Sequence, residues 1–214
     1  MSDITGLGTI LGVWARPGDE TFLAAGLTAL AREAGNRVAC ATATRGERGT
    51  DDAAGLPPGR LGALREEELA AALDLLGVNE HHWLGLADGS CAGVVPTVGI
   101  RAVRRVLDAV RPDTVVTPGT GDPDRRAVSR WTVAAVGTVA RDIRLLHAAT
   151  GRGTEDGPEP VLRLRLEGPV LDRKIAAIRR YATRVDPATG DAALRARWGV
   201  ECLVAAGAGA TVAA

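Results

Sequence analysis

The sequence predicts an α/β fold, with a Rossmann-like, mostly parallel sheet, helices on both faces and a single domain. Short apolar runs alternate along the chain with segments that repeat apolar residues at helical spacing. Most runs end in polar loops that contain Gly or Pro. The length of 214 residues, with 46% hydrophobic and 24% charged residues, suits one folded core. Repeated strand–helix–strand units favour a parallel sheet that is covered on both sides.

The first half of the chain supplies three strands and two helices. Residues 9–15 (TILGVWA) form an apolar run that ends at Arg16-Pro17-Gly18, which is typical of a buried strand followed by a turn. A helix is expected over residues 20–34, because Gly35 follows its last apolar position. Residues 37–44 predict a strand, 45–59 a polar loop, 61–76 a helix that Gly77 ends, and 82–86 a short strand.

The second half continues the alternation and then changes character. We expect helices over 98–110 and 127–142 and strands over 114–117 and 144–148. Residues 151–160 are rich in loop formers, and 161–166 alternate apolar and polar residues like an edge strand. A last amphipathic helix is expected over 171–184. The domain should therefore cover residues 1–204, and the Ala- and Gly-rich residues 205–214 should form a flexible tail.

Composition excludes several classes of function. Lys and Arg number 26 against 26 Asp and Glu, so no basic excess points to a nucleic-acid partner. No apolar run approaches the length of a membrane span. The start of the chain lacks the pattern of a secretory signal, and the three cysteines show no CxxC spacing, which favours a reduced, cytoplasmic protein. A homo-oligomer or a protein partner is left open.

Polar loops that follow the predicted strands are the candidate binding region. In open parallel sheets, ligands bind beyond the carboxyl ends of the strands. Residues 16–20, 45–49 and 119–126 are loops of this kind. No Gly-x-Gly-x-x-Gly pattern follows the first strand, so a nicotinamide cofactor is not expected.

These loops carry motifs that occur in a recognisable order. They read Ala15-Arg16-Pro17-Gly18-Asp19-Glu20, then Thr44-Arg45-Gly46-Glu47-Arg48-Gly49, and later Gly121-Asp122-Pro123-Asp124-Arg125-Arg126. In this order they resemble the motifs of the PIG-L/LmbE family of zinc-dependent N-deacetylases, over about residues 7–185. The resemblance implies a Rossmann-like fold, hydrolysis of C–N amide bonds in N-acyl amino sugars, and a zinc ion.

The chain departs from the family at the metal site. The family's first motif is Ala-His-Pro-Asp-Asp-Glu, in which the His and the second Asp bind zinc and the first Asp is the general base. Here Arg16 stands at the His position and Gly18 at the base position, while Asp19 is kept. The family's later motif resembles His-Pro-Asp-His, and Asp122 and Arg125 stand at its two His positions.

Arginine cannot replace a histidine ligand, because a guanidinium has no lone pair to donate and stays protonated. We therefore expect no zinc cofactor at this position. Arg16 and Arg125 should instead pair with neighbouring carboxylates and bind an anionic ligand. The candidate catalytic residues are Asp19, Asp122 and Asp124. Each of these aspartates precedes or begins a helix, so helix capping alone would also explain them.

Three further polar residues lie at positions that resemble the family's substrate-contacting residues. These are Glu47, Arg65 and Asp88. Their simpler explanations are a solvated loop acid, a helix-surface ion pair of Arg65 with Glu68, and a turn residue before Gly89. Cys91 lies nearby, but a nucleophilic cysteine needs a base or strong positive charge. The three histidines, His81, His82 and His147, are expected to pack or to be solvated rather than to bind a metal.

Three functional hypotheses follow. The leading one is a divergent, metal-free family member that is no classical deacetylase and binds a polar small molecule, in a secondary-metabolite or a thiol or amino-sugar pathway. The second is an active N-acyl amino-sugar or amide deacetylase, with a hard metal ion held by the carboxylates of Asp19, Asp122 and Asp124. The third is a non-hydrolytic enzyme or partner subunit that holds an anionic substrate with Arg16 and Arg125. The first leads because both metal histidines and the base are replaced together.

Overall fold

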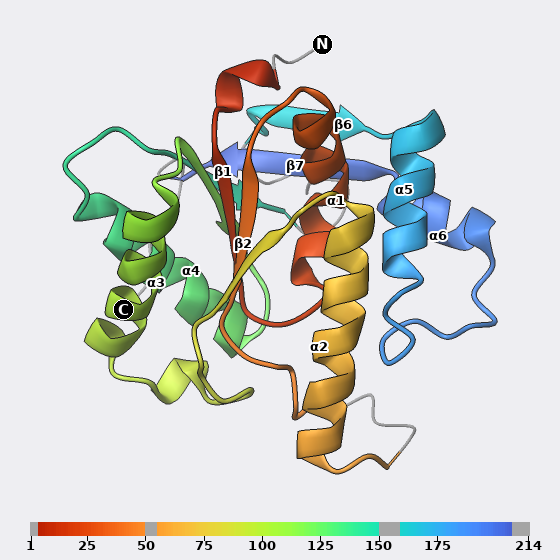
Figure 1. Ribbon diagram of the computed structural model, residues 1–214, viewed down its shortest axis with the longest axis horizontal. Helices are drawn as coiled ribbons and strands as arrows, with labels where there is room; N and C mark the ends of the chain where they lie inside the picture. The colour runs from red at the N-terminus through yellow and green to blue at the C-terminus, as the bar shows by residue number, and fades with distance from the viewer. Residues whose placement is uncertain (1–3, 50–54, 150–158, 207–214) are drawn as a thin grey trace.

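The computed structural model describes residues 4–49, 55–149 and 159–206, and within them seven strands form one sheet (Figure 1). Their order across the sheet is β3-β2-β1-β4-β5-β7-β6. The strands are β1 (Ile10–Trp14), β2 (Val38–Thr42), β3 (Glu80–Trp83), β4 (Thr114–Pro118), β5 (Arg144–Ala148), β6 (Leu162–Arg165) and β7 (Val200–Ala205). Residues 151–158 of the predicted loop and 207–214 of the predicted tail lie outside the described residues.

Strand direction confirms the predicted class of sheet. Strands β1 to β5 are parallel to one another, with Gly12 of β1 opposite Cys40 of β2 and Val116 of β4. β7 runs antiparallel to both β5 and β6. The chain proceeds outward from β1 to β2 and β3, and then returns to β4 on the other side of β1. The order therefore reverses between β1 and β4, which is where such sheets bind ligands.

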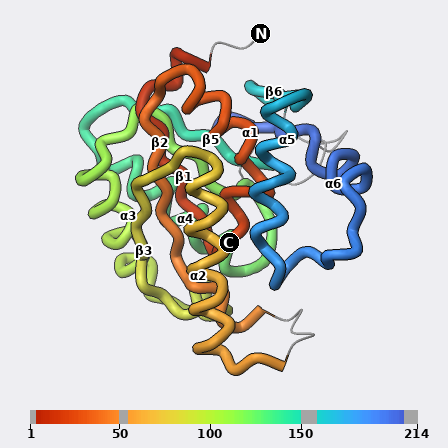
Figure 2. Tube along the Cα trace, turned by 45° about the vertical axis from the view of Figure 1, so that its right-hand side comes forward, coloured from red at the N-terminus to blue at the C-terminus, as the bar shows by residue number. Residues whose placement is uncertain are grey.

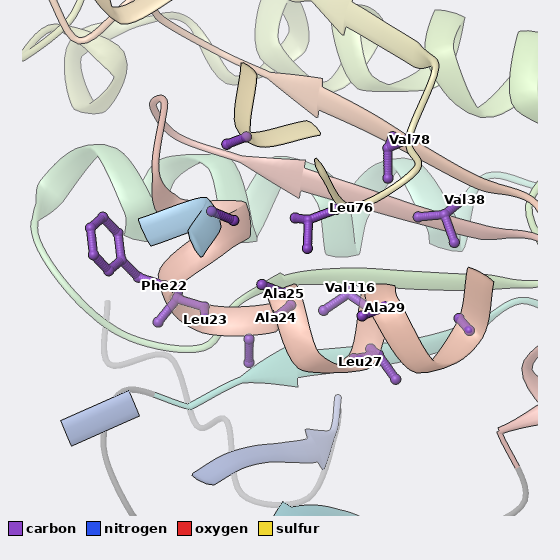
Figure 3. Close-up of a cluster of buried hydrophobic side chains, with 14 of the residues drawn as sticks. Phe22, Leu23, Ala24, Ala25, Leu27, Ala29, Val38, Leu76, Val78 and Val116 are labelled. Atoms are coloured by element: carbon purple, nitrogen blue, oxygen red, sulfur yellow. The ribbon is translucent and has the colours of Figure 1, made fainter. Parts of the chain in front are cut away.

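Helices cover both faces of the sheet. They are α1 (Asp19–Glu33), α2 (Pro58–Leu75), α3 (Pro96–Val110), α4 (Pro123–Gly137), α5 (Gly168–Ile178) and α6 (Asp191–Trp198). α1, α2 and α5 pack together on one face, and α3 and α4 pair on the other (Figures 1 and 2). Figure 3 shows the cluster of buried side chains around α1, which includes Leu23 and Leu27 of the helix together with Leu76, Val38 and Val116. None of the helices in the described part of the chain is long and apolar enough to cross a membrane.

Several predicted element boundaries were wrong. β3 begins at Glu80 rather than at residue 82, so both neighbouring histidines belong to it. α4 covers Pro123–Gly137 instead of residues 127–142, because Asp122 caps it by accepting the backbone N–H groups of Asp124 and Arg125. α5 ends at Ile178, and the next residues turn away from its axis. The sequence analysis missed α6 and β7 altogether.

Helix α1 is interrupted, and a buried carboxylate fills the break. Ala24 has non-helical angles (φ −146°, ψ 16°). Glu201 of β7 accepts the backbone N–H groups of Gly26 and Leu27 at 2.7 and 2.8 Å. Its third partner is the Nζ of Lys174 on α5, at 2.6 Å, and both side chains are at most 1% exposed. This ion pair connects α1, α5 and the antiparallel strand β7.

Acid should destabilise the fold through His81 on the edge strand β3. Burial, and then the charge of His82, lowers the pKa of His81 from 6.5 to about 4. Between these two values the unfolded chain binds more protons, so the free energy of unfolding falls as the pH drops. We expect the loss of stability between pH 7 and pH 5, measured by urea unfolding, to be smaller in His81→Gln. His82→Gln is the comparison variant: it removes the smaller influence of the His82 charge but leaves His81 buried, so it should retain most of the loss. An equal loss in all three proteins would contradict this account.

Candidate functional site

The site lies at the carboxyl ends of β1 and β4, where the order of the sheet reverses. The loop after β1 supplies Arg16, and the first residue of α1 is Asp19. The loop after β4 supplies Asp122, and the first turn of α4 contains Arg125. Two ion pairs cross between these segments: Arg16 pairs with Asp122, and Arg125 pairs with Asp19. The sequence analysis expected such pairing but did not determine which residues pair.

Asp19 is the buried member of the pair with Arg125. Its side chain is fully buried, and its Oδ1 accepts the Nη2 and Nε groups of Arg125 at 2.6 and 3.2 Å. Its Oδ2 accepts the backbone N–H of Arg16 at 3.4 Å. Burial lowers the pKa of Arg125, but the charge of Asp19, its hydrogen bond and the charge of Asp122 together outweigh burial, so the net pKa lies above the usual value. Arg125 therefore remains a fixed cation beside the buried carboxylate.

Asp122 is the accessible carboxylate of the site. Its side chain is 34% exposed, whereas those of Asp19 and Asp124 are at most 3% exposed. It accepts the Nη2 of Arg16 at 2.8 Å and also caps α4. Burial raises the pKa of Asp122. The charges of Arg16 and Arg125 and the backbone N–H groups together lower it by more, so the net pKa is below its usual value. A water molecule or substrate can therefore meet an ionised carboxylate here.

Asp124 and Asp88 are buried supports behind the ion pairs. Asp124 accepts the backbone N–H groups of Gly89 and Cys91 at 2.7 and 3.0 Å. Asp88 accepts the hydroxyl of Thr44 and the backbone N–H of Arg48. The Nε of Arg16 lies 3.6 Å from Asp88 and is buried without a hydrogen-bond partner. These carboxylates hold three loops together and orient Arg16.

Glu47 and Arg65 also lie in this region, but they do not join the crossed ion pairs. Glu47 accepts the backbone N–H of Asp88 at 2.9 Å, and its Oε2 is buried without a partner. Arg65 is 5% exposed, donates to the carbonyl of Gly46 and reaches the hydroxyl of Thr183 at 3.3 Å. The suggested Arg65–Glu68 ion pair is absent among the described residues, because Glu68 accepts both the N–H and the hydroxyl of Thr183.

The sequence analysis missed the contribution of the segment after α5. The hydroxyl of Tyr181 donates to the buried Glu20, and the Nη1 of Arg184 donates to the carbonyl of Pro17 at 2.6 Å. Arg184 also lies 3.9 Å from Asp19. These residues are more than 160 positions from their partners in the sequence. No local sequence pattern could have revealed these contacts, because the partners lie on segments that are far apart in the chain. The expected helix also ran through residue 184, past the end of α5 at Ile178.

Neither the nearby cysteine nor the histidines supply further catalytic groups. Burial, and then the charge of Asp124, raises the pKa of Cys91 to about 12, so its thiol stays protonated at neutral pH. His81 and His82 lie on the edge strand β3, two strands away from β1. His147 lies within β5, and burial lowers its pKa.

The donor set does not fit a zinc ion. A catalytic zinc site needs about three protein ligands and an open position. Arg16 and Arg125 offer no lone pair, and the carboxylate of Asp19 is already engaged by Arg125. Within the described ranges, no three His, Cys, Asp or Glu side chains are grouped to hold a metal ion. The three carboxylates suggested as an alternative metal site are each engaged: Asp19 and Asp122 pair with arginines, and Asp124 accepts two backbone N–H groups.

The chain is similar to proteins named as deacetylases. The family model "GlcNAc-PI de-N-acetylase" matches residues 11–136. A 1D-myo-inositol 2-acetamido-2-deoxy-alpha-D-glucopyranoside deacetylase of Nakamurella multipartita is 37% identical over 59% of this chain and 54% of its own length. The same-named protein of Acidothermus cellulolyticus is 30% identical over 83% of this chain and 80% of its own. The chain thus spans about half the length of the first of these relatives.

A solved structure agrees with the fold. The conserved protein TT1542 from Thermus thermophilus is 26% identical, with a TM-score of 0.72 over 95% of this chain and 96% of that one. The hypothesis of a binding protein that is no deacetylase was wrong, because relatives 30–37% identical are named as deacetylases. That hypothesis rested on the loss of the metal-binding histidines, although the other family motifs are retained in the sequence. Because the family model covers more than half of its residues, the chain belongs to the GlcNAc-PI de-N-acetylase (PIG-L) family.

Proposed function

We propose that this chain is an amidase that removes the acyl group from an N-acyl amino sugar, with two guanidiniums in place of a metal ion. The observation that carries the proposal is the crossed pair of ion pairs. It fixes Arg16 and Arg125 at the positions where the family resemblance places the metal-binding histidines. The names of the relatives supply the reaction class and the substrate class.

The charge of the site supports this substitution. In the family motif, a doubly charged zinc ion is balanced by one aspartate ligand and one aspartate base. Here two guanidiniums, Arg16 and Arg125, are balanced by Asp19 and Asp122. The formal charge is zero in both sets. Fixed cations of this kind stabilise negative charge that develops in a transition state, although they do not acidify a bound water as a metal does.

Asp122 takes the role of the base in this scheme, because it is the accessible carboxylate of the crossed ion pairs. It accepts a proton from water while the water oxygen attacks the amide carbonyl carbon. Arg16 and Arg125 stabilise the resulting oxyanion, and their side chains are 21% and 18% exposed. The C–N bond then breaks, and the amine leaves with the proton from Asp122. The products are a carboxylic acid and a free amino sugar, and the acid then gives its remaining proton to the amine, which leaves a carboxylate and an ammonium group. The lowered pKa makes Asp122 a weak base, so we expect slow turnover.

Amine release tests the proposal directly. The purified chain is incubated with 1D-myo-inositol 2-acetamido-2-deoxy-alpha-D-glucopyranoside and with N-acetylglucosamine, and the primary amine is measured by its fluorescamine fluorescence. We expect release above the protein-free control, and a decrease of about 100-fold in kcat in Arg16→Ala. Arg130→Ala on α4 is the matched control, since Arg130 is exposed on the same element that contains Arg125. Saturable binding without amine release would overturn the proposal in favour of a non-hydrolytic enzyme.

The proposed compartment is the cytoplasm. The three cysteines, Cys40, Cys91 and Cys202, are all buried and form no disulfide among the described residues. Reduced thiols suit a reducing environment.

A further inference from the structure

A third guanidinium fills the space of the side chain that position 18 lacks. Gly18 has φ +98°, and a Cβ built there would lie 2.6 Å from the Nη1 of Arg184 and 2.9 Å from the ring of Phe22. Any larger residue at position 18 would therefore displace Arg184 as well as strain the backbone. The two features depend on each other: the glycine admits a cation where the family motif has its base.

Contacts on several sides hold Arg184 in place. Its Nη1 donates to the carbonyl of Pro17 at 2.6 Å, and its guanidinium carbon lies 5.0 Å from the centre of the Phe22 ring. The preceding residue, Thr183, is bound to Glu68 of α2 through both its N–H and its hydroxyl, at 2.8 and 2.6 Å. The side chain still keeps 22% exposure. Arg184 is thus a preorganised and partly accessible cation at the edge of the site.

Arg184 lacks a close carboxylate of its own. Among the described residues, only Asp19 lies within 4.0 Å, at 3.9 Å, and the same oxygen already accepts Arg125 at 2.6 Å. Arg65 is the neighbouring cation: its Nε reaches the hydroxyl of Thr183, the residue before Arg184, at 3.3 Å. Burial first, and then the charge of Arg184, lowers the pKa of Arg65, while the charges of Asp88 and Glu68 raise it in part. Arg184 is thus a partly exposed guanidinium whose nearest carboxylate oxygen already accepts Arg125, and an anion would stabilise it.

We propose that Arg184, with the buried charge of Arg65 behind it, binds a carboxylate or phosphate group on the substrate, so that the preferred substrate is an acidic N-acyl amino sugar. This inference rests on the proposed function, and it adds the charge of the substrate to it. A guanidinium fork matches the planar geometry of a carboxylate and of a phosphate face. Arg184 is then a specificity-determining residue, while Arg16 and Arg125 act on the amide.

Calorimetric binding tests the inference without requiring turnover. The full chain is titrated with N-acetylglucosamine, with its 6-phosphate, and with N-acetylmuramic acid, which carries a carboxylate. We expect at least one acidic sugar to bind about tenfold more tightly than the neutral sugar, the value of one charge-assisted hydrogen bond. The stronger of the two acidic ligands identifies the anion as phosphate or carboxylate. Arg184→Gln should reduce the preference to about twofold or less.

Arg180→Gln is the matched control, because Arg180 is exposed, carries the same charge and lies four residues before Arg184. It should keep the full preference. Arg184→Lys keeps the charge and should keep part of the preference, which separates a lost charge from a damaged fold. A wild-type chain that binds all three sugars equally would overturn the inference, and so would equal losses in Arg180→Gln and Arg184→Gln. An anion preference without amine release would refute the proposed hydrolysis alone.

Discussion

Glu201→Ala should destabilise the fold more than the loss of any surface ion pair. The variant removes the acceptor of two backbone N–H groups in the interrupted helix α1, and it leaves the ammonium group of Lys174 buried without its counter-charge. Breaking a buried pair from one side costs about 3–5 kcal/mol. Urea unfolding, followed by circular dichroism, should show this loss in the free energy of unfolding.

Asp172→Ala is the matched control for Glu201→Ala. Asp172 also pairs with a basic residue, Arg195, and lies on α5 with Lys174, but its side chain is 58% exposed. Its removal should cost less than about 1 kcal/mol. Lys174→Met should cost less than Glu201→Ala, because the carboxylate keeps its two backbone donors. Equal effects of Glu201→Ala and Asp172→Ala would refute the structural role of the buried pair.

Arg125→Ala should have the second largest effect, because it leaves the fully buried carboxylate of Asp19 without its main partner. The remaining contacts are a 3.4 Å bond from the backbone of Arg16 and the charge of Arg184 at 3.9 Å. The expected loss is about 2–4 kcal/mol of unfolding free energy. A double-mutant cycle with Asp19→Asn should give a coupling energy of about 2 kcal/mol.

The other crossed pair supplies the internal comparison. Arg16 and Asp122 have side chains that are 21% and 34% exposed, so solvent weakens their attraction. The same cycle with Arg16→Ala and Asp122→Asn should give a coupling energy of about 1 kcal/mol or less. If the two cycles gave equal couplings, the buried Asp19–Arg125 pair would not be the structural centre of the site.

The parallel part of the fold could be predicted because local patterns determine it. The apolar runs of β1, β2, β4 and β5 end in polar loops, and all four strands formed close to their expected positions. The antiparallel strand β7 could not be predicted from its own residues. Its place between β5 and β6 depends on the burial of Glu201 against Lys174 and α1, which are contacts between distant segments.

The site could be predicted in part for the same reason. The loops after β1 and β4 were expected to meet, and their arginines and aspartates do pair. The start of α4 was misplaced at residue 127, whereas Asp122 is the residue that accepts the free N–H groups and the helix begins at Pro123. Arg184 was missed because its position depends on a vacant side-chain space at Gly18, which only the three-dimensional structure reveals.

The central claim is that the guanidiniums of Arg16 and Arg125 replace a metal ion in an active amidase. The most direct test is to measure metal content and amine release on the same preparation, before and after dialysis against a chelator. The account predicts well below one metal ion per chain, with amine release unchanged by the chelator. About one zinc ion per chain, with activity that is lost on chelation and restored by zinc, would contradict it.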